Sequence, residues 1–301
     1  MPPNVPVEWN DLPPEIKRHC IKSLDYKSRC QLRCTSRLEK NLVDSFKVHF
    51  QFAAFIFSER KELVLIIVEN DDGHTFNKHT VAINPQRSET KVVPMFASLI
   101  NAAISIEFLY LDNWGEATVS HPAIPNFIKV NNLILRRQHT VKRFIGACDP
   151  ETIKSITAHS HLEVLDRYLI TLDLMNVVPF FNLHFDSDPA IGTHFAHAWE
   201  RWDVDVGKTL RFSTVYNGVT SHFRRHFQQK IVPSGDRLSV RFAMNNGINH
   251  IILFRTSVEH MEGYRKVTYL LTVIPANTKP SQYAEIRNTY NSIGNRFKRY
   301  V

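Results

Sequence analysis

Histidine is the residue type in this sequence with the most capacity for chemistry, since it occurs 15 times in 301 residues. His194 and His197 are spaced i, i+3, and His222 and His226 are spaced i, i+4, so each pair could share one helix face and bind a metal ion. No third ligand accompanies either pair at a standard spacing. We therefore expect surface or half-buried histidines, no metal site and no cofactor.

The sequence also lacks the motifs of a catalytic centre. It contains no nucleophile elbow, phosphate-binding loop or dinucleotide fingerprint. Its 10 glycines are few for loops that cradle phosphates. Asp186 and Asp188 could form a carboxylate pair, but the run Asp-Ser-Asp-Pro that contains them favours a turn after a strand. We therefore expect that the protein is not an enzyme and has no catalytic residues.

Basic segments offer a second kind of chemistry. The net charge is +8, and the segments 221–230 (SHFRRHFQQK) and 295–301 (NRFKRYV) mix cationic and aromatic side chains, as a nucleic-acid surface could. For residues 221–230 the alternative is an amphipathic helix with Phe223 and Phe227 buried and its charges solvated. Neither segment matches a known RNA-binding motif. Weak contact with nucleic acid remains an open interpretation.

Composition narrows the class of protein. Hydrophobic residues make up 43% and charged residues 22%, as in ordinary soluble proteins, so disorder is excluded as the main state. The longest aliphatic run, Leu63 to Val68, is far shorter than the roughly 20 residues that cross a bilayer, so we expect no membrane contact. The first residues lack the pattern of a signal peptide. Four cysteines without a Cys-x-x-Cys pair then indicate reduced core thiols in the cytoplasm or nucleus.

The elements that could position binding residues start with a predicted helix near the N-terminus. Asp11 can cap it, and Pro13 and Pro14 fit its first turn, where amides lack helical partners. Its apolar stripe consists of Ile16, Cys20, Ile21 and Leu24.

Two further helices follow within the first 50 residues. Asp25 can cap the second, and Ser36 with Glu39 forms a capping box that opens the third. The apolar face of the third helix holds Leu38, Leu42 and Phe46. Three helices in about 40 residues bury little surface. This unit therefore either packs on the rest of the chain or completes its core with another protein.

From residue 51 the pattern changes to β. The runs 52–57 (FAAFIF) and 63–68 (LVLIIV) flank a polar segment and predict a hairpin. The shorter runs 80–84 and 91–93 predict two more strands. Near the C-terminus, 238–243 and 248–254 flank Asn245-Asn246-Gly247 and predict another hairpin. Residues 267–274 predict a further strand, and 282–300 a final helix.

A repeat of about 24 residues runs through the middle of the chain. Each unit has the form apolar-x-x-apolar-x-apolar, and helix-like stretches at 95–104, 123–130, 141–148, 171–178 and 194–199 separate the units. Leucine-rich repeats, which combine a strand with a helix, have this shape. The alternative is an ordinary α/β arrangement. The units are Ile106, Leu109 and Leu111; Val130, Leu133 and Leu135; Ile153, Ile156 and Ala158; Val178, Phe181 and Leu183; and an irregular fifth around Leu210 and Phe212.

The segment 9–45 resembles an F-box. The family pattern has a Leu-Pro start, an acidic residue, an apolar helix ending at Leu-Asp, a Ser-basic pair, a Leu-Arg and a Ser before the third helix. Thr35 stands where the family usually has Val, and Glu39 where it often has Trp. The matching positions are Leu12, Pro13, Glu15, Ile16, Leu24, Asp25, Ser28, Arg29, Leu32, Arg33 and Ser36.

A finer resemblance is to the nematode F-box A group, in which an FTH domain follows the F-box. It rests on residues 25–45 (DYKSRCQLRCTSRLEKNLVDS) and on 130–159, with CDPETIKSI at 148–156, which is similar to the start of an FTH domain.

The resemblance implies partners. An F-box binds a Skp-type adaptor, which docks on a cullin–RING ubiquitin ligase, and the remaining domain selects a protein substrate. Arg29 and Arg33 would lie near the acidic surface of the adaptor and mainly affect the association rate. The alternative for each apolar position is packing against the chain's own second domain. The apolar positions that match adaptor contacts in the family are Leu12, Pro13, Ile16, Ile21, Leu24 and Leu32.

The resulting prediction is a mixed α/β protein in which a small three-helix F-box precedes a leucine-rich-repeat-like domain with β-rich flanks. We expect a tail at 1–8, the F-box at 9–50, a β-rich connection at 51–93 and an FTH-like substrate domain at 94–301. The expected function is substrate recognition in ubiquitin-dependent degradation, in the cytoplasm or nucleus. An RNA-associated regulator and a scaffold that binds the adaptor without ubiquitination are the alternatives. The sequence does not identify the substrate, its phosphorylation or the binding face.

Overall fold

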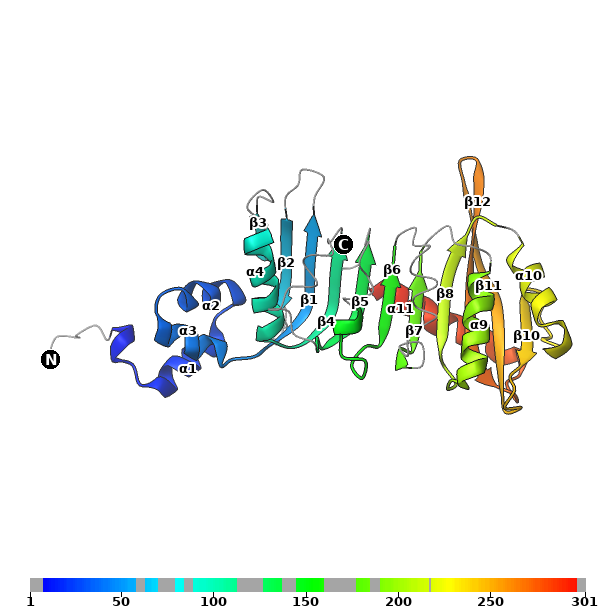
Figure 1. The fold of residues 1–301 in the computed structure, drawn as a ribbon, viewed down its shortest axis with the longest axis horizontal. Helices are drawn as coiled ribbons and strands as arrows, with labels where there is room; N and C mark the ends of the chain where they lie inside the picture. The colour runs from blue at the N-terminus through cyan, green and yellow to red at the C-terminus, as the bar shows by residue number, and fades with distance from the viewer. Residues whose placement is uncertain are drawn as a thin grey trace.

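The computed structural model describes residues 8–57, 63–69, 79–83, 89–112, 127–136, 145–159, 177–184, 190–216 and 218–296. Figure 1 shows a small helical unit at the N-terminal end, followed by one long sheet with helices on both faces. This arrangement confirms the predicted α/β class. No helix in the described part of the chain is long and apolar enough to cross a membrane.

The helical unit contains the three predicted helices. The Asp25 side chain accepts a hydrogen bond from the Ser28 amide at 2.7 Å and caps the second helix. The Ser36 side chain accepts one from the Glu39 amide at 3.2 Å and caps the third. Both predicted caps are confirmed. The elements are η1 (Trp9–Asp11), α1 (Pro14–Ser23), α2 (Tyr26–Arg33) and α3 (Arg37–Asp44).

Two local predictions in this unit are wrong. Asp11 does not cap α1, because it lies in η1 and Pro13 occupies the N-cap of α1 without a side-chain hydrogen bond. The predicted apolar face of α3 is also displaced. Leu38 is 66% exposed, whereas Glu39 and Val43 are buried. The helix turns Glu39 inward because this carboxylate has partners inside the unit.

In the described residues, twelve strands form a single sheet in the order β3-β2-β1-β4-β5-β6-β7-β8-β12-β11-β10-β9. The middle of the sheet, from β1 through β4 to β8, is parallel, and both ends are antiparallel. The strands are β1 (Val48–Phe57), β2 (Leu63–Glu69), β3 (His79–Ile83), β4 (Ala103–Asp112), β5 (Val130–Arg136), β6 (Ser155–Ala158), β7 (Phe180–Leu183), β8 (Thr209–Thr214), β9 (Ile231–Val232), β10 (Ser239–Ala243), β11 (Asn249–Met261) and β12 (Tyr264–Pro275).

The repeated apolar positions form one continuous core ladder. Leu109 pairs with Leu133, which pairs with Ile156, then Phe181, then Leu210. All five side chains are fully buried in the main core. The predicted repeat is therefore confirmed as a spatial repeat. It also extends to β1, whose Phe50, Ala53 and Phe55 pair with Ile106, Leu109 and Leu111.

Helices cover both faces of the sheet. Residues of α4 (Glu89–Ala102), α9 (Ile191–Trp202) and α10 (Val219–His226) contribute to the main core on one face. On the other face, α11 (Tyr283–Arg296) packs Tyr283 against the antiparallel end, and Figure 1 shows it behind the sheet. A third apolar cluster on that face, around Phe52 and Tyr110, lies on β1, β2, β4 and β5.

The remaining strand and helix predictions can be compared directly. Both predicted hairpins are confirmed, as β1–β2 and β10–β11, and Gly247 has the positive φ of +70° that the second turn requires. The predicted strand at 80–84 is β3, and that at 267–274 lies within β12. The helix-like stretch at 194–199 lies in α9.

Other predictions fail or lie outside the described residues. The segment 91–93 is not a strand but part of α4, where an apolar run too short to show a period was misassigned. The boundary expected at residue 94 also falls inside α4, and 51–93 contributes three strands to the common sheet. The Asp186–Pro189 turn, most of the helix-like stretches at 123–130, 141–148 and 171–178, and residues 297–301 lie outside the described part.

Candidate functional site

The helical unit has a small interior of its own. Ile21 on α1 is completely buried, and Val43 on α3 is 7% exposed. Two charged side chains share this interior, since Lys17 is 6% and Glu39 is 4% exposed. So few buried apolar residues leave the unit dependent on other contacts for its stability.

Trp9, Lys17 and Glu39 join η1, α1 and α3. The indole Nε1 of Trp9 donates to Glu39 Oε1 at 3.1 Å, and Lys17 Nζ lies 3.7 Å from the same oxygen. Lys17 Nζ also lies 5.7 Å from the centre of the Trp9 ring. Ser36 Oγ donates to the second carboxylate oxygen. The hydrogen bonds from Ser36 and Trp9 hold the pKa of Glu39 below its usual value.

The two arginines predicted to face an adaptor have partners within the chain. Arg29 donates from Nε to the Ile21 carbonyl and from Nη2 to the Lys22 carbonyl, both at 3.1 Å, so it caps the end of α1. Arg33 forms a two-pronged pair with Asp44 of α3, at 2.5 and 3.2 Å. This bond raises the pKa of Arg33. Both arginines therefore hold helices of the unit in position, apart from any contact with an adaptor.

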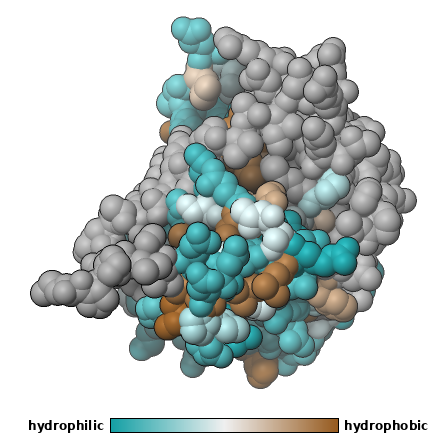
Figure 2. All heavy atoms as spheres, turned by 90° about the vertical axis from the view of Figure 1, so that its left-hand side faces the viewer, coloured by the Kyte–Doolittle hydropathy of each residue, from teal (hydrophilic) through white to brown (hydrophobic). Residues whose placement is uncertain are grey.

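The predicted apolar contacts divide into three groups by exposure. Pro13 and Ile16 are exposed, Ile16 to 48%. Leu12, Leu24 and Leu32 are half-buried. Ile21 is fully buried and unavailable at the surface in this conformation. Figure 2, which views the end of the molecule formed by the helical unit, shows hydrophobic surface between hydrophilic side chains.

Leu38 is an apolar surface residue that the sequence reasoning placed inside. It is 66% exposed, more than Ile16. In the sequence, the capping box of Ser36 and Glu39 is the feature that indicates this exposure of Leu38. Ser36 at the N-cap fixes Glu39 at the third helical position, and the Trp9 contact then turns Glu39 inward. Leu38, one residue earlier, must therefore lie about 100° away from the buried face.

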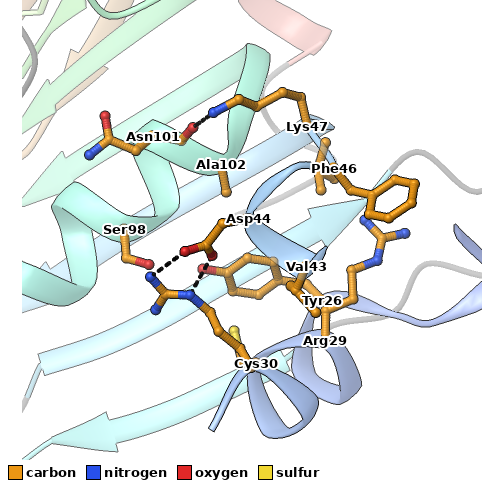
Figure 3. A pocket seen from close by; sticks show the side chains of 12 residues that line it. Tyr26, Arg29, Cys30, Val43, Asp44, Phe46, Lys47, Ser98, Asn101 and Ala102 are labelled. Carbon is orange, nitrogen blue, oxygen red and sulfur yellow. Dashed lines mark hydrogen bonds and ion pairs between the residues drawn. The ribbon is translucent and has the colours of Figure 1, made fainter. Parts of the chain in front are cut away.

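The helical unit meets the sheet through α2. The Tyr26 ring contacts Phe50 of β1 edge to face, at 5.3 Å between centres, and burial raises the pKa of the Tyr26 hydroxyl. A cavity of about 230 Å³ lies beside this contact. Figure 3 shows Asp44 and Tyr26 lining it from the helical unit and Ser98 and Asn101 from α4. Its volume is below the roughly 300 to 1,000 Å³ of most ligand pockets, so we assign it a role in joining the two parts.

The histidine pairs lie between α9 and α10. His197 is 5.2 Å from His226, ring centre to ring centre, and His226 is stacked on His222 at 5.2 Å. Burial, then the charge of His226, lowers the pKa of His197. Among the described residues no group of three or more His, Cys, Asp or Glu side chains is placed to hold a metal ion.

The basic segment 221–230 is an amphipathic helix and the turn that follows it. Phe223 is fully buried and Phe227 is 3% exposed, both in the main core. Arg224 and Arg225 point to solvent. The aromatic side chains are thus core residues and are not available to stack on bases, which favours the amphipathic alternative.

The comparisons with known proteins give a match, and it lies on the helical unit. Residues 9–51 match the F-box domain family, which covers η1, α1, α2, α3 and the start of β1. No curated protein and no solved structure matches the chain.

Proposed function

From the F-box domain at residues 9–51, we propose that this chain is the adaptor-binding subunit and substrate receptor of a Skp–cullin–F-box ubiquitin ligase. The observation that carries the proposal is the combination of this match with an exposed apolar surface on the same unit. Ile16, Pro13 and Leu38 are exposed on a module too small to stabilise itself. A Skp-type adaptor would cover this surface and connect the chain to a cullin.

The rest of the chain has the complementary role in this proposal. The sheet that begins at β1, with an FTH-like later part, acts as the domain that selects a protein substrate in the cytoplasm or nucleus. The chain supplies position, while other ligase subunits carry out ubiquitin transfer, so it is not itself an enzyme. The Tyr26–Phe50 contact supports this division, because it fixes the adaptor-binding end against the sheet.

Co-purification of the full chain with a Skp-type adaptor tests the proposal. Wild type should form a stable complex. Ile16→Ala and the double variant Leu12→Ala/Pro13→Ala should each weaken it by about 1 to 3 kcal/mol, as truncation of interface anchors does. Ile248→Ala is the matched control, because Ile248 is 70% exposed in the turn between β10 and β11, at the other end of the molecule.

Two outcomes would contradict the proposal. One is failure of the wild-type chain to bind any adaptor. The other is equal loss of binding in the Ile16 and Ile248 variants. Salt separates the proposal from binding to RNA, since contacts with phosphates weaken steeply between 50 and 200 mM salt, whereas an apolar interface changes much less.

A further inference from the structure

Polar and cationic side chains gather at the carboxyl ends of neighbouring parallel strands. β5 ends at Arg136, His159 follows β6, and His184 follows β7. Their neighbours Leu135, Ala158 and Leu183 belong to the main core, which also contains residues of α4, α9 and α10. By alternation, the side chains of Arg136, His159 and His184 therefore lie on the opposite face of the sheet. The rings of His159 and His184 are stacked, 4.5 Å apart and 2° from parallel.

Two more cations extend this group. Arg211 on β8 is half-buried and lies near Glu259. Lys266 on β12 is half-buried and lies close enough to His159 for its charge to lower the pKa of that imidazole. We call Arg136, His159, His184, Arg211 and Lys266 the basic row. Burial first, then the charges of Arg136 and Lys266, lower the pKa of His159 to about 4. At neutral pH the row therefore places the cations Arg136, Arg211 and Lys266 around an uncharged His159 imidazole.

Hydrogen bonding at the row is incomplete among the described residues. Asn182, 4% exposed, places Nδ2 2.9 Å from His184 Nε2, but its buried Oδ1 has no partner. Arg211, which pairs with Asn182 across the strands, has a buried Nε without a partner. Buried polar atoms in proteins are nearly always paired. Apolar side chains at these two positions would stabilise the sheet better than unpaired polar ones. The unpaired atoms of Asn182 and Arg211 therefore indicate a ligand-binding role and not a structural one.

A projecting hairpin borders the row. The last pair between β8 and β12 is Thr214–Val267, and β11 and β12 continue past it as a two-stranded ribbon. Figure 1 shows this ribbon rising beyond the sheet at the edge where the parallel strands end. Met261 and Tyr264 pair at its tip, and each is 48% exposed. Ligands of open α/β sheets bind at this carboxyl edge.

We propose that this edge is the substrate-binding surface, with the basic row holding a phosphate or carboxylate group of a protein segment and Met261 and Tyr264 contacting its apolar side chains. This inference rests on the proposed function and names the chemistry of the substrate. Two carboxylates favour a discrete anionic group over a nucleic-acid backbone. Asp112 lies near Arg136, and Glu259 lies opposite Lys266 across β11 and β12, so both carboxylates would repel a continuous line of phosphates.

The test uses the full chain with inorganic phosphate as the first probe. NMR titration of the histidine ring protons should show the pKa of His159 rising toward 6.5 as phosphate is added, because a bound anion favours imidazolium. Arg136→Gln/Lys266→Gln should abolish this effect. The control Arg224→Gln/Arg225→Gln removes the same charge from the exposed surface of α10 and should leave the effect intact.

Three synthetic peptides of one sequence identify the source of the anion. They carry Ser, Glu or phosphoserine at one position between leucines, and the Ser peptide should bind weakest. A preference for phosphoserine would indicate phosphorylated substrates, and equal binding of Glu would indicate acidic ones. Met261→Ala/Tyr264→Ala should weaken peptide binding about 5- to 30-fold and leave the phosphate effect unchanged.

Three results would overturn the inference. Phosphate could leave the titration of His159 and His184 unchanged, or the phosphate effect could be lost equally in Arg136→Gln/Lys266→Gln and Arg224→Gln/Arg225→Gln. The third is displacement of the peptides by single-stranded RNA at physiological salt. Adaptor co-purification of the same variants keeps the two proposals apart. Arg136→Gln/Lys266→Gln should still bind the adaptor. Anion binding by a chain that binds no adaptor would refute the ligase function and leave the anion site standing.

Discussion

Glu39 shows how a single departure from a family pattern is accommodated. It stands where F-box sequences often carry Trp, and its carboxylate accepts a hydrogen bond from the indole of Trp9 in η1. Lys17 Nζ lies near both groups, 5.7 Å from the centre of the Trp9 ring and 3.7 Å from the Glu39 carboxylate. The network ties η1, and with it the neighbouring Leu12 and Pro13, to the helices behind them.

Acidification should loosen this network. The pKa of Glu39 is lowered on folding, so its contribution to stability is present above the unfolded carboxyl pKa of about 4.3 and is lost as pH falls through the lower folded value. Glu39→Gln should lower the protection of residues 12–46 from hydrogen exchange at pH 7 and reduce its acid dependence. Glu15→Gln, on the exposed side of α1, should change neither. Unaltered exchange in the Glu39 variant would contradict the role of the network.

The two isoleucines of α1 should behave in opposite ways. Ile21→Ala empties a fully buried position and should destabilise the helical unit by about 2 to 5 kcal/mol. Ile16→Ala removes an exposed side chain and should change stability by less than about 0.5 kcal/mol while weakening adaptor binding. Hydrogen exchange of the free chain measures the stability, and co-purification measures the binding. A stability loss in Ile16→Ala as large as that in Ile21→Ala would place both residues in the core.

The sequence could not show which groups of the chain the arginines of α2 bind. Motif matching places Arg29 and Arg33 toward a partner, because it compares residue types at fixed positions. The structure shows Arg29 bonded to the last carbonyls of α1 and Arg33 to Asp44. These contacts depend on the angles between helices, which no local spacing records.

At the scale of elements, the packing of α9 against α10 involves a histidine with a lowered pKa. The ring of His197 contacts both His226 and Phe227. The charges around it come from both helices and the following turn: His194, His226 and Lys230 lower its pKa, and Glu200 raises it. Protonation of His197 would place a charge against the core residue Phe227.

Below neutral pH this helix pair should therefore lose stability. Since the folded pKa of His197 is lowered, its neutral form stabilises the pair above the unfolded pKa of about 6.5, and this stability is lost as pH falls toward the folded value. The protection factors of the α10 amides, taken relative to the intrinsic exchange rate at each pH, should fall between pH 7.5 and 5.5. His197→Gln should reduce that fall, whereas His260→Gln on the exposed hairpin should not. An unchanged pH dependence in His197→Gln would show that the His cluster does not control α10.

The elements differ in how well their sequence predicts them. Long strands and the hairpin around Gly247 were predictable, because alternation and turn chemistry act locally. The run at 91–93 was not, since three apolar residues fit a strand and a helix equally, and the helix is set by the rest of α4. Leu38 was misplaced because a tertiary contact of its neighbour Glu39 decides the rotation of α3.

At the scale of the whole molecule, β1, β2 and β3 belong to the same body as the later strands. β1 pairs in parallel with β4, and its Phe55 packs on Phe96 of α4 with ring centres 4.6 Å apart. Both side chains are fully buried. A connection that supplies core residues cannot be separated from the domain it leads to.

Phe55→Ala should therefore destabilise the whole sheet rather than a local segment, by about 3 to 5 kcal/mol. Urea unfolding of the full chain, followed by circular dichroism and tryptophan fluorescence, measures this loss. A truncated chain of residues 94–301 should fail to fold, whereas 48–301 should fold. A stable, cooperatively unfolding 94–301 fragment would restore the boundary predicted from the sequence.

The repeat shows what one sequence reveals about an entire fold. The equivalent core positions of β4 to β7 were visible, because each unit repeats the same spacing on the same face. Phe50 of β1 was missed as a member of this ladder because two antiparallel strands and α4 intervene in the chain. The basic row was missed for a similar reason. Its members lie on or directly after five strands and meet only after the sheet has formed.

The core ladder of the parallel strands also has a consequence for the evolution of the gene. Each parallel strand presents the same core pattern to the strand before it and to the strand after it, and both ends of the sheet are antiparallel. An in-frame duplication or loss of one unit would alter the width of the parallel region and leave the two ends and the F-box unchanged. Paralogues could thus diverge in the width of the sheet while keeping the same F-box domain.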